Sequence, residues 1–196
     1  MSRIIGLLFL LCFAACSTKN SNTGEWPIVN NLAEIDMVDL NGNDIEWNTL
    51  QDFEANVFVF ISPECPLCEN YTKTISLLQE EYGDEKVNWQ AIVAGSYYPI
   101  TQIDSFLNVY QFEIDVLLDK EYKLANYLKA TVTPEVFVLN ESGMIEYEGK
   151  IDNWIYKLGI KRPNITAFYL NDAIDAILNG DEILIKETTA VGCIIE

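Results

Sequence analysis

The amino-acid sequence predicts an α/β fold in which a central mixed β-sheet is flanked by helices. Two largely apolar runs, at residues 57–61 and 87–94, are typical of buried strands. After the first run, apolar residues recur at spacings of three and four, which is the pattern of an amphipathic helix. Alternation of strands with helices favours a partly parallel sheet. The length of 196 residues suits one domain with a full core.

Residues 1–16 are predicted to be a targeting segment rather than part of the fold. A positive charge precedes an apolar stretch that is too short to span a membrane comfortably, and two alanines directly precede Cys16. This ending resembles the bacterial lipoprotein signal, which implies a lipid anchor on Cys16. The alternative is an ordinary secretory signal. Both place the domain outside the cytoplasm, where disulfides persist. With the lipid anchor, we expect it in the bacterial cell envelope, facing the periplasm or the exterior.

The remaining chain divides into three parts. Residues 17–34 are predicted to be a flexible tether, because they begin with small polar residues and show no periodicity. Residues 35–185 form the predicted domain, and residues 186–196 form a C-terminal tail that carries Cys193.

A β-hairpin is expected at the start of the domain. Residues 35–40 partly alternate between apolar and polar, and the Asn-Gly-Asn-Asp sequence at residues 41–44 is a turn signal. Ile45 and Trp47 then resume the apolar pattern. The hairpin would therefore precede the first core strand.

Later elements follow from periodicity and turn signals. The helix after the first core strand should end near Gly83, and a helical insert is expected near residues 100–130. An antiparallel hairpin should turn at residues 140–143, and a final amphipathic helix is expected over residues 164–179. Apolar positions expected on the last two long helices are Ile103, Phe106, Leu107, Tyr110, Phe168, Leu170, Ile174, Ile177 and Leu178.

The candidate active site is a Cys-x-x-Cys pair placed where a core strand leads into a helix. A thiol attacks only as thiolate, and the N-terminus of a helix favours negative charge. Pro66 suits the first helical position, so Cys65 should be the attacking and more exposed thiol and Cys68 the resolving thiol one turn later. We expect the acidic neighbours Glu64 and Glu69 to leave the pKa of Cys65 less depressed than in a strongly oxidising enzyme.

Two other interpretations of the pair are a zinc site and a structural disulfide. The chain has no histidine, so a zinc site would need Cys193 and an acidic residue as further ligands. We therefore favour redox chemistry and expect no metal and no cofactor. The net charge of −18 also argues against a nucleic-acid partner, because phosphate contacts need Lys and Arg. We expect a monomer.

A second motif, Val132-Thr133-Pro134, stands directly before a predicted strand. X-Pro bonds can be cis, and a cis proline fixes a tight turn. Such a turn against Cys65 would expose the backbone of Thr133, with which a substrate chain could pair as a strand. The alternative is an ordinary trans proline that opens an edge strand.

Together the two motifs resemble the thioredoxin superfamily, over roughly residues 35–150. The helical insert and the N-terminal hairpin make the chain more similar to the redoxin branch, which holds alkyl-hydroperoxide reductases and thiol–disulfide oxidoreductases. The resemblance implies Cys65 as nucleophile, Cys68 as resolving thiol and Pro134 as the cis proline beside them. The usual buried acidic residue of the central strand is missing. Glu135 is the nearest candidate proton acceptor, and the alternative is a Glu at the edge of the sheet.

Cys193 is the remaining cysteine of the domain and tail. One interpretation is a third redox cysteine on a mobile tail, which accepts the disulfide from Cys65–Cys68; Gly192 would permit the motion. The other interpretation is a small buried apolar residue or an incidental thiol.

Three functions are consistent with these features. The first is a membrane-tethered thiol–disulfide oxidoreductase that exchanges with protein thiols or disulfides through a mixed disulfide at Cys65. The second is a thiol peroxidase in which Cys65 attacks a peroxide. Peroxidases of this superfamily use a Thr three positions before the cysteine and a nearby Arg, whereas Ser62 stands here and Arg162 is the only arginine after residue 3. The third is a non-enzymatic lipoprotein domain held by a structural disulfide.

Overall fold

The structure, a computed structural model, describes residues 32–83 and 86–196, and Cys16 and the predicted targeting segment lie outside them. A six-stranded sheet with strand order β1-β4-β3-β2-β6-β7 forms its centre. In chain order the elements are β1 (Val38–Asp39), the 3-10 helix η1 (Trp47–Asp52), β2 (Ala55–Ile61), α1 (Pro66–Tyr82), β3 (Val87–Ala94), α2 (Ile100–Tyr110), β4 (Asp115–Asp119), α3 (Lys123–Leu128), β5 (Val132–Thr133), β6 (Glu135–Leu139), β7 (Ile145–Gly149), β8 (Ile155–Lys157), β9 (Ile160–Lys161), α4 (Tyr169–Asn179) and β10 (Cys193–Ile194).

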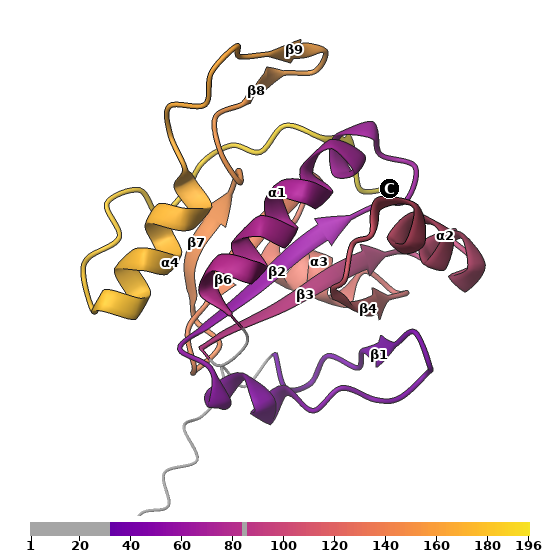
Figure 1. Ribbon diagram of the computed structural model, residues 1–196. Helices are drawn as coiled ribbons and strands as arrows, with labels where there is room; N and C mark the ends of the chain where they lie inside the picture. The colour runs from indigo at the N-terminus through magenta and orange to yellow at the C-terminus, as the bar shows by residue number, and fades with distance from the viewer. Residues whose placement is uncertain (1–31, 84–85) are drawn as a thin grey trace, which may run out of the picture.

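The sheet is mixed, as the sequence predicted. Strand β2 pairs in parallel with β3 and antiparallel with β6, and β3 pairs in parallel with β4. Every residue of β2 is buried, because helices cover both faces of the sheet. Because β2 and β3 run parallel, both strands end on the same side of the sheet, which is where α1 begins (Figure 1).

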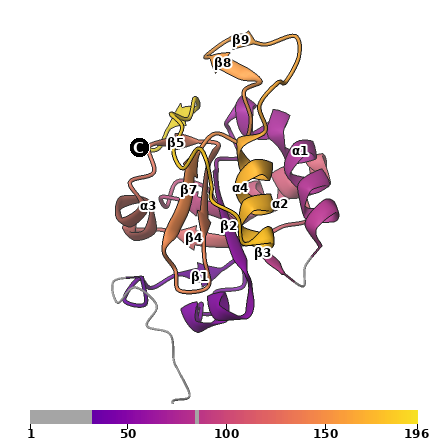
Figure 2. The same cartoon turned by 90° about the vertical axis from the view of Figure 1, so that its left-hand side faces the viewer.

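Two hydrophobic cores lie on opposite faces of the sheet. Helices α1, α2 and α4 cover one face, and α3 and η1 contribute to the other (Figures 1 and 2). Alternate residues of β2 point to each side: Val57 and Val59 belong to the first core, and Phe58 and Phe60 to the second. This double burial explains why β2 is a continuous apolar run in the sequence.

The predicted N-terminal hairpin forms only in part. The chain turns where expected, since the Asp39 carboxylate accepts backbone hydrogen bonds from Asn41 and Asn43, each 2.8 Å long. Beyond the turn, however, only an isolated antiparallel bridge joins Val38 to Asp44, and Trp47 starts η1 instead of a second strand. The Trp47 indole donates a 2.7 Å hydrogen bond to the Ile35 carbonyl. Helical spacing lets η1 bury Trp47 and also Leu50, the next residue on that face.

The last helix begins later than predicted. Helix α4 starts at Tyr169 and not at residue 164, because Asn153 holds the preceding segment by hydrogen bonds to Thr166. The Asn153 amide group donates to the Thr166 hydroxyl, and its oxygen accepts from the Thr166 backbone amide. Phe168, which was expected in the apolar face, is 47 % exposed. The β6–β7 hairpin and the end of α1 at Gly83 are confirmed.

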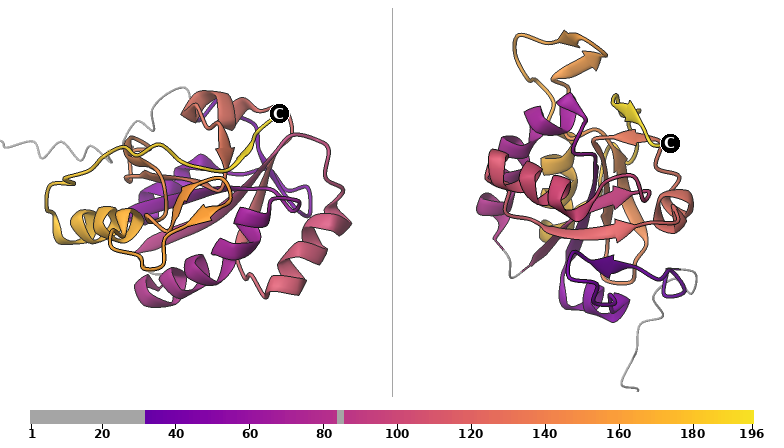
Figure 3. Two further views of the ribbon diagram at one scale, coloured as in Figure 1. Left: turned by 90° about the horizontal axis from the view of Figure 1, so that it is seen from above. Right: turned by 90° about the vertical axis from the view of Figure 1, so that its right-hand side faces the viewer.

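The C-terminal segment returns from α4 across the end of the sheet. Glu187 bridges in parallel to Glu148 of β7, and β10 then pairs antiparallel with β5 (Figure 3). The segment thus brings Cys193 beside the start of α1, where Cys65 lies. Among the residues that the structure describes, no helix has the length and apolar character needed to cross a membrane.

Candidate redox site

Cys65 occupies the N-cap position of α1, as the sequence predicted. Its backbone is extended, with φ −87° and ψ 111°, and Pro66 follows at the first helical position. The Cys65 amide donates to the Ser62 carbonyl over 3.1 Å, and its carbonyl accepts from the Glu69 amide over 3.2 Å. The thiol therefore lies where β2 leads into α1, at the positive N-terminal end of the longest described helix.

Cys68 lies one turn along α1, on the side facing the core. It is 2 % exposed, and its sulfur accepts a 3.4 Å hydrogen bond from the Ser62 backbone amide. Cys65 is only 1 % exposed, so the expectation that it is the exposed thiol of the pair was wrong. The reason is that the C-terminal segment covers it, which helix geometry alone does not reveal.

The Thr133–Pro134 peptide bond is cis, as predicted, and the Thr133 carbonyl faces the active-site pair. The Cys65 thiol lies 3.1 Å from that carbonyl oxygen, which accepts its hydrogen bond. Thr133 is 4 % exposed, and its hydroxyl has no hydrogen-bond partner in residues 32–83 and 86–196.

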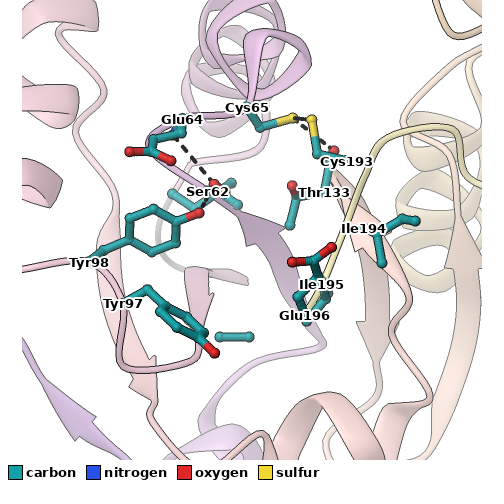
Figure 4. A pocket seen from close by; sticks show the side chains of 12 residues that line it. Ser62, Glu64, Cys65, Tyr97, Tyr98, Thr133, Cys193, Ile194, Ile195 and Glu196 are labelled. Atoms are coloured by element: carbon teal, nitrogen blue, oxygen red, sulfur yellow. Dashed lines mark hydrogen bonds between the residues drawn. The ribbon is translucent and has the colours of Figure 1, made fainter.

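Cys193 lies against Cys65, with the two sulfur atoms 2.6 Å apart (Figure 4). The contact joins residues 128 positions apart in the sequence. It follows from the pairing of β10 with β5, in which Cys193 stands opposite Thr133 and Ile194 opposite Val132. The backbone edge that the sequence suggested for a substrate chain is thus occupied by the protein's own C-terminal segment.

The pKa values of the thiols of Cys65, Cys68 and Cys193 differ. The pKa of Cys65 falls to about 4, chiefly because Cys68 hydrogen-bonds to its sulfur, with Cys193 and Thr133 adding to the effect and burial opposing it. Burial raises the pKa of Cys68 well above its ordinary value, and a Cys65 thiolate beside it adds to the rise. Burial and Cys65 likewise raise the pKa of Cys193 to about 12. Cys65 is therefore the thiolate of the group.

The expectation of a modestly depressed Cys65 pKa was wrong. The Glu64 carboxylate accepts a 3.0 Å hydrogen bond from the Gln102 side chain, and Glu69 interacts with Tyr110, so neither acid is among the causes of the Cys65 shift. The neighbouring thiols, one of them from the distant C-terminal segment, outweigh the acidic flanks.

Glu135 is the first residue of β6. Its carboxylate accepts backbone hydrogen bonds from Thr131 over 2.7 Å and from Val132 over 3.3 Å. Within the described part of the chain its hydrogen bonds go to these amides and to neither thiol. In this arrangement Glu135 holds the segment that carries Thr133.

A cavity of about 480 Å³ opens beside the cysteines, and the sequence analysis missed several of its residues. The Ser62 hydroxyl donates a 2.8 Å hydrogen bond to the hydroxyl of Tyr98 (Figure 4). Tyr97 and Tyr98 follow the end of β3, as Ser62 follows β2. Because parallel strands end together, residues just past such ends are candidates for one site, and this signal was available in the sequence. Arg162 lies over the Tyr156 ring and does not line the cavity.

Comparison with known proteins agrees with this geometry. The sequence profile of the AhpC/TSA family matches residues 29–151, which is well over half of the chain. No curated protein sequence shows significant similarity.

Solved structures support the same fold. A hypothetical protein from Sinorhizobium meliloti 1021 is 21 % identical, with a TM-score of 0.69 over 82 % of this chain and 88 % of that chain. A thioredoxin-like protein from Aeropyrum pernix is 14 % identical, with a TM-score of 0.55 over 78 % and 92 % of the two chains. A secreted disulfide oxidoreductase from Mycobacterium tuberculosis is 15 % identical, with a TM-score of 0.54 over 77 % and 98 %.

The fold is therefore thioredoxin-like, and a cysteine pair lies at the start of its first long helix beside a cis proline. The chain belongs to the AhpC/TSA family of redoxins, and it is a thiol-dependent oxidoreductase.

Proposed function

We propose that the protein is a thiol–disulfide oxidoreductase that acts on protein disulfides through Cys65. One observation carries the proposal: Cys65 caps α1 as a low-pKa thiol, one turn from Cys68 and 3.1 Å from the carbonyl of the residue before the cis proline. A thiolate at neutral pH, a resolving thiol and a backbone edge are what disulfide exchange requires.

The disulfide exchange proceeds in two steps. The Cys65 thiolate attacks one sulfur of a substrate disulfide, a mixed disulfide forms, and the other substrate sulfur leaves as a thiolate. Cys68 then loses its proton and attacks Cys65, which closes the Cys65–Cys68 disulfide and releases the second substrate thiolate. The substrate gains two electrons and the cysteine pair loses them.

Burial of Cys68 keeps the two steps in order. Its raised pKa holds it as a thiol, so it does not compete with Cys65 for the substrate. The Ser62 amide, which already donates to the Cys68 sulfur, would stabilise the thiolate when Cys68 attacks. Cys68 therefore acts after the mixed disulfide has formed.

The substrate class is a protein chain that presents a cysteine in an extended segment. The β5 edge at Thr131–Thr133 offers backbone groups in the pairing that β10 uses. The C-terminal segment would have to leave this edge when a substrate chain binds. The likeness to a secreted disulfide oxidoreductase is consistent with this class.

We also propose that the domain is tethered to a membrane of the cell envelope by a lipid on Cys16. Support comes from the sequence alone: an apolar stretch, two alanines and then Cys16. Metabolic labelling with a palmitate analogue in a bacterial host should mark the protein, and Cys16→Ser should abolish the label. An unlabelled wild-type protein would indicate the ordinary secretory signal instead.

Turnover of a protein disulfide tests the proposed function. We expect the purified protein to catalyse the reduction of insulin disulfides by dithiothreitol, and both Cys65→Ser and Cys68→Ser to lose catalysis. Consumption of hydrogen peroxide, measured beside it, should be the slower reaction, because Ser62 and Arg162 depart from the peroxidase pattern. Faster peroxide turnover would replace the proposal with a thiol peroxidase. A pair that stays oxidised under excess dithiothreitol would indicate a structural disulfide.

The reduction potential of the pair then sets the direction of electron flow. A value near about −250 mV or lower would support a reductant of other proteins, and a value near about −120 mV an oxidant.

A further inference from the structure

The C-terminal segment is bound in a defined position. Beside β7, the Glu148 amide donates to the Lys186 carbonyl over 3.0 Å, and the Thr188 amide donates to the Glu148 carbonyl over 2.9 Å. Beside β5, the Ile195 amide donates to the Thr131 carbonyl over 3.0 Å. Hydrogen bonds therefore hold the segment on both sides of Cys193.

Two glycines allow the segment to approach the sheet closely. A Cβ atom at Gly192 would lie well inside contact distance of the Thr133 carbonyl oxygen, and one at Gly149 would overlap Thr188. The segment thus packs against backbone at two separate places where a larger residue does not fit. Such contacts fix the register that brings Cys193 to Cys65.

Exposure distinguishes Cys193 from the other two cysteines. Cys65 and Cys68 are 1 % and 2 % exposed, whereas Cys193 is partly exposed at the rim of the cavity. While the segment is bound, Cys193 is therefore the most exposed of these three cysteines.

We propose that Cys193 is a third redox cysteine, which takes over the disulfide from Cys65–Cys68 and is the sulfur at which an external dithiol protein reduces the enzyme. The inference rests on the proposed oxidoreductase function. It is carried by the 2.6 Å contact of the Cys65 and Cys193 sulfurs, by the bound segment and by the exposure of Cys193.

The first step is an internal exchange with no net oxidation. Cys193 loses its proton and attacks the Cys65 sulfur, the Cys65–Cys193 bond forms, and the Cys65–Cys68 bond breaks. Cys68 leaves as a thiolate and takes up a proton. The disulfide has then moved from a buried pair to a pair with one partly exposed sulfur.

The second step brings in two electrons from the external dithiol. One of its thiolates attacks Cys193, and Cys65 leaves as a thiolate. The second thiol of the partner then attacks the mixed disulfide and releases Cys193 as a thiol. The partner becomes a disulfide, and Cys65, Cys68 and Cys193 are all reduced. A low-pKa sulfur is the better leaving group, which favours attack at Cys193 over attack at Cys65.

The first test maps the disulfide directly. Cys68→Ser, treated with one equivalent of diamide and quenched in acid, should give an intramolecular Cys65–Cys193 disulfide in a monomer, as identified by peptide mass spectrometry. Thr189→Ala in the same background is the control, because Thr189 is an exposed residue of the same segment. Absence of the Cys65–Cys193 peptide, with both thiols still alkylatable, would overturn the proposal.

The second test measures reduction of the oxidised enzyme by reduced thioredoxin, a dithiol protein too large to enter the cavity. Cys193→Ser should slow this reduction about tenfold or more relative to the wild type. Thr189→Ala should not change it. A segment that only shields Cys65 would give a different result: deletion of residues 191–196 would speed reduction, and Cys193→Ser would match the wild type. That pattern would overturn the proposal.

The two proposals fail in distinguishable ways. If neither the wild type nor any variant reduces insulin disulfides, the oxidoreductase function is wrong. If the wild type and Cys193→Ser are both active and equally fast with reduced thioredoxin, only the role of Cys193 is wrong.

Discussion

Cys65 has two sulfur neighbours, and they reach it by different routes. Cys68 comes from the next turn of the same helix, so α1 alone keeps it in place. Cys193 comes from 128 positions away and depends on hydrogen bonds to β5 and β7. The comparison shows that one partner is fixed by local geometry, whereas the other is present only while a separate segment is bound.

Removing the sulfur that the two neighbours share should have the largest effect. Cys65→Ser eliminates both the Cys65–Cys68 and the Cys65–Cys193 pairs, so reduction of insulin disulfides should fall to the uncatalysed rate. Circular dichroism should show an unchanged fold, because serine is similar in size. Residual turnover would mean that Cys193 or Cys68 attacks substrates by itself.

Releasing only the C-terminal segment should remove the contact of Cys193 with Cys65 and leave the Cys65–Cys68 pair intact. Gly192→Ala places a Cβ against the Thr133 backbone, which should release the C-terminal segment at a cost of about 1–3 kcal/mol in its binding. We expect faster alkylation of Cys65 by iodoacetamide and loss of the Cys65–Cys193 disulfide, both measured by mass spectrometry. Thr189→Ala should behave as wild type, and unchanged alkylation of Gly192→Ala would show that the segment does not shield Cys65.

Protonation of Cys65 should make the stability of the reduced protein depend on pH. Its pKa is about 4 when folded, against about 8.5 for an ordinary cysteine, so from about pH 6 to 8 the folded state binds fewer protons than the unfolded state. The free energy of unfolding should therefore rise with pH, by up to about 1.4 kcal/mol per pH unit, and this stabilisation is lost as pH falls toward 4.

Urea denaturation under a reductant at several pH values measures this slope. Cys65→Ser should remove its contribution, and Cys193→Ser should reduce it, because the Cys193 thiol helps to lower the Cys65 pKa. An identical slope in Cys65→Ser and the wild type would show that Cys65 is not the group responsible.

A smaller change should follow from the unpaired hydroxyl of Thr133. Thr133→Val keeps the shape but removes a hydroxyl that is buried without a partner in the described residues, so stability should rise by about 1 kcal/mol. Urea denaturation measures the effect, and a loss of stability would reveal a hydrogen bond to the hydroxyl.

The smallest effect is expected at Glu135. Glu135→Gln keeps an oxygen that can accept from the Thr131 amide, so stability should change by less than about 1 kcal/mol. The rate at which Cys68 resolves a mixed disulfide should keep its pH profile in rapid-quench measurements. A shifted profile would restore Glu135 as the proton acceptor.

Features that depend on adjacent residues could be predicted from the sequence, whereas features that depend on the distant C-terminal segment could not. The Cys-x-x-Cys pair at a helix start, Pro66 at the first helical position and the cis proline depend on a few adjacent residues, and the prediction of each agrees with the structure. The low pKa of Cys65 comes chiefly from Cys68 on the same helix, and Cys193 adds to it. The burial of Cys65 depends on the C-terminal segment, whose position is set by the pairing of β10 with β5. No local pattern in the sequence encodes that pairing.

Two further differences have the same origin. Gly192 was interpreted as a source of motion, but the structure needs a glycine there because the segment touches the Thr133 backbone. The late start of α4 results from hydrogen bonds between Asn153 and Thr166. In both cases a contact with a residue distant in the sequence determines the local structure more than the neighbouring residues do.

The shortness of β10 has a consequence for competition between the protein's own chain and a substrate. A tethered segment acts at an effective concentration on the order of millimolar, far above that of most protein partners. A long paired strand at that concentration would block the β5 edge almost permanently. Because β10 pairs over only two residues, a substrate strand that pairs with β5 over a longer stretch would compete with it for this edge. Strand length would thus set how selective the enzyme is, so that a chain which pairs poorly with β5 never reaches Cys65.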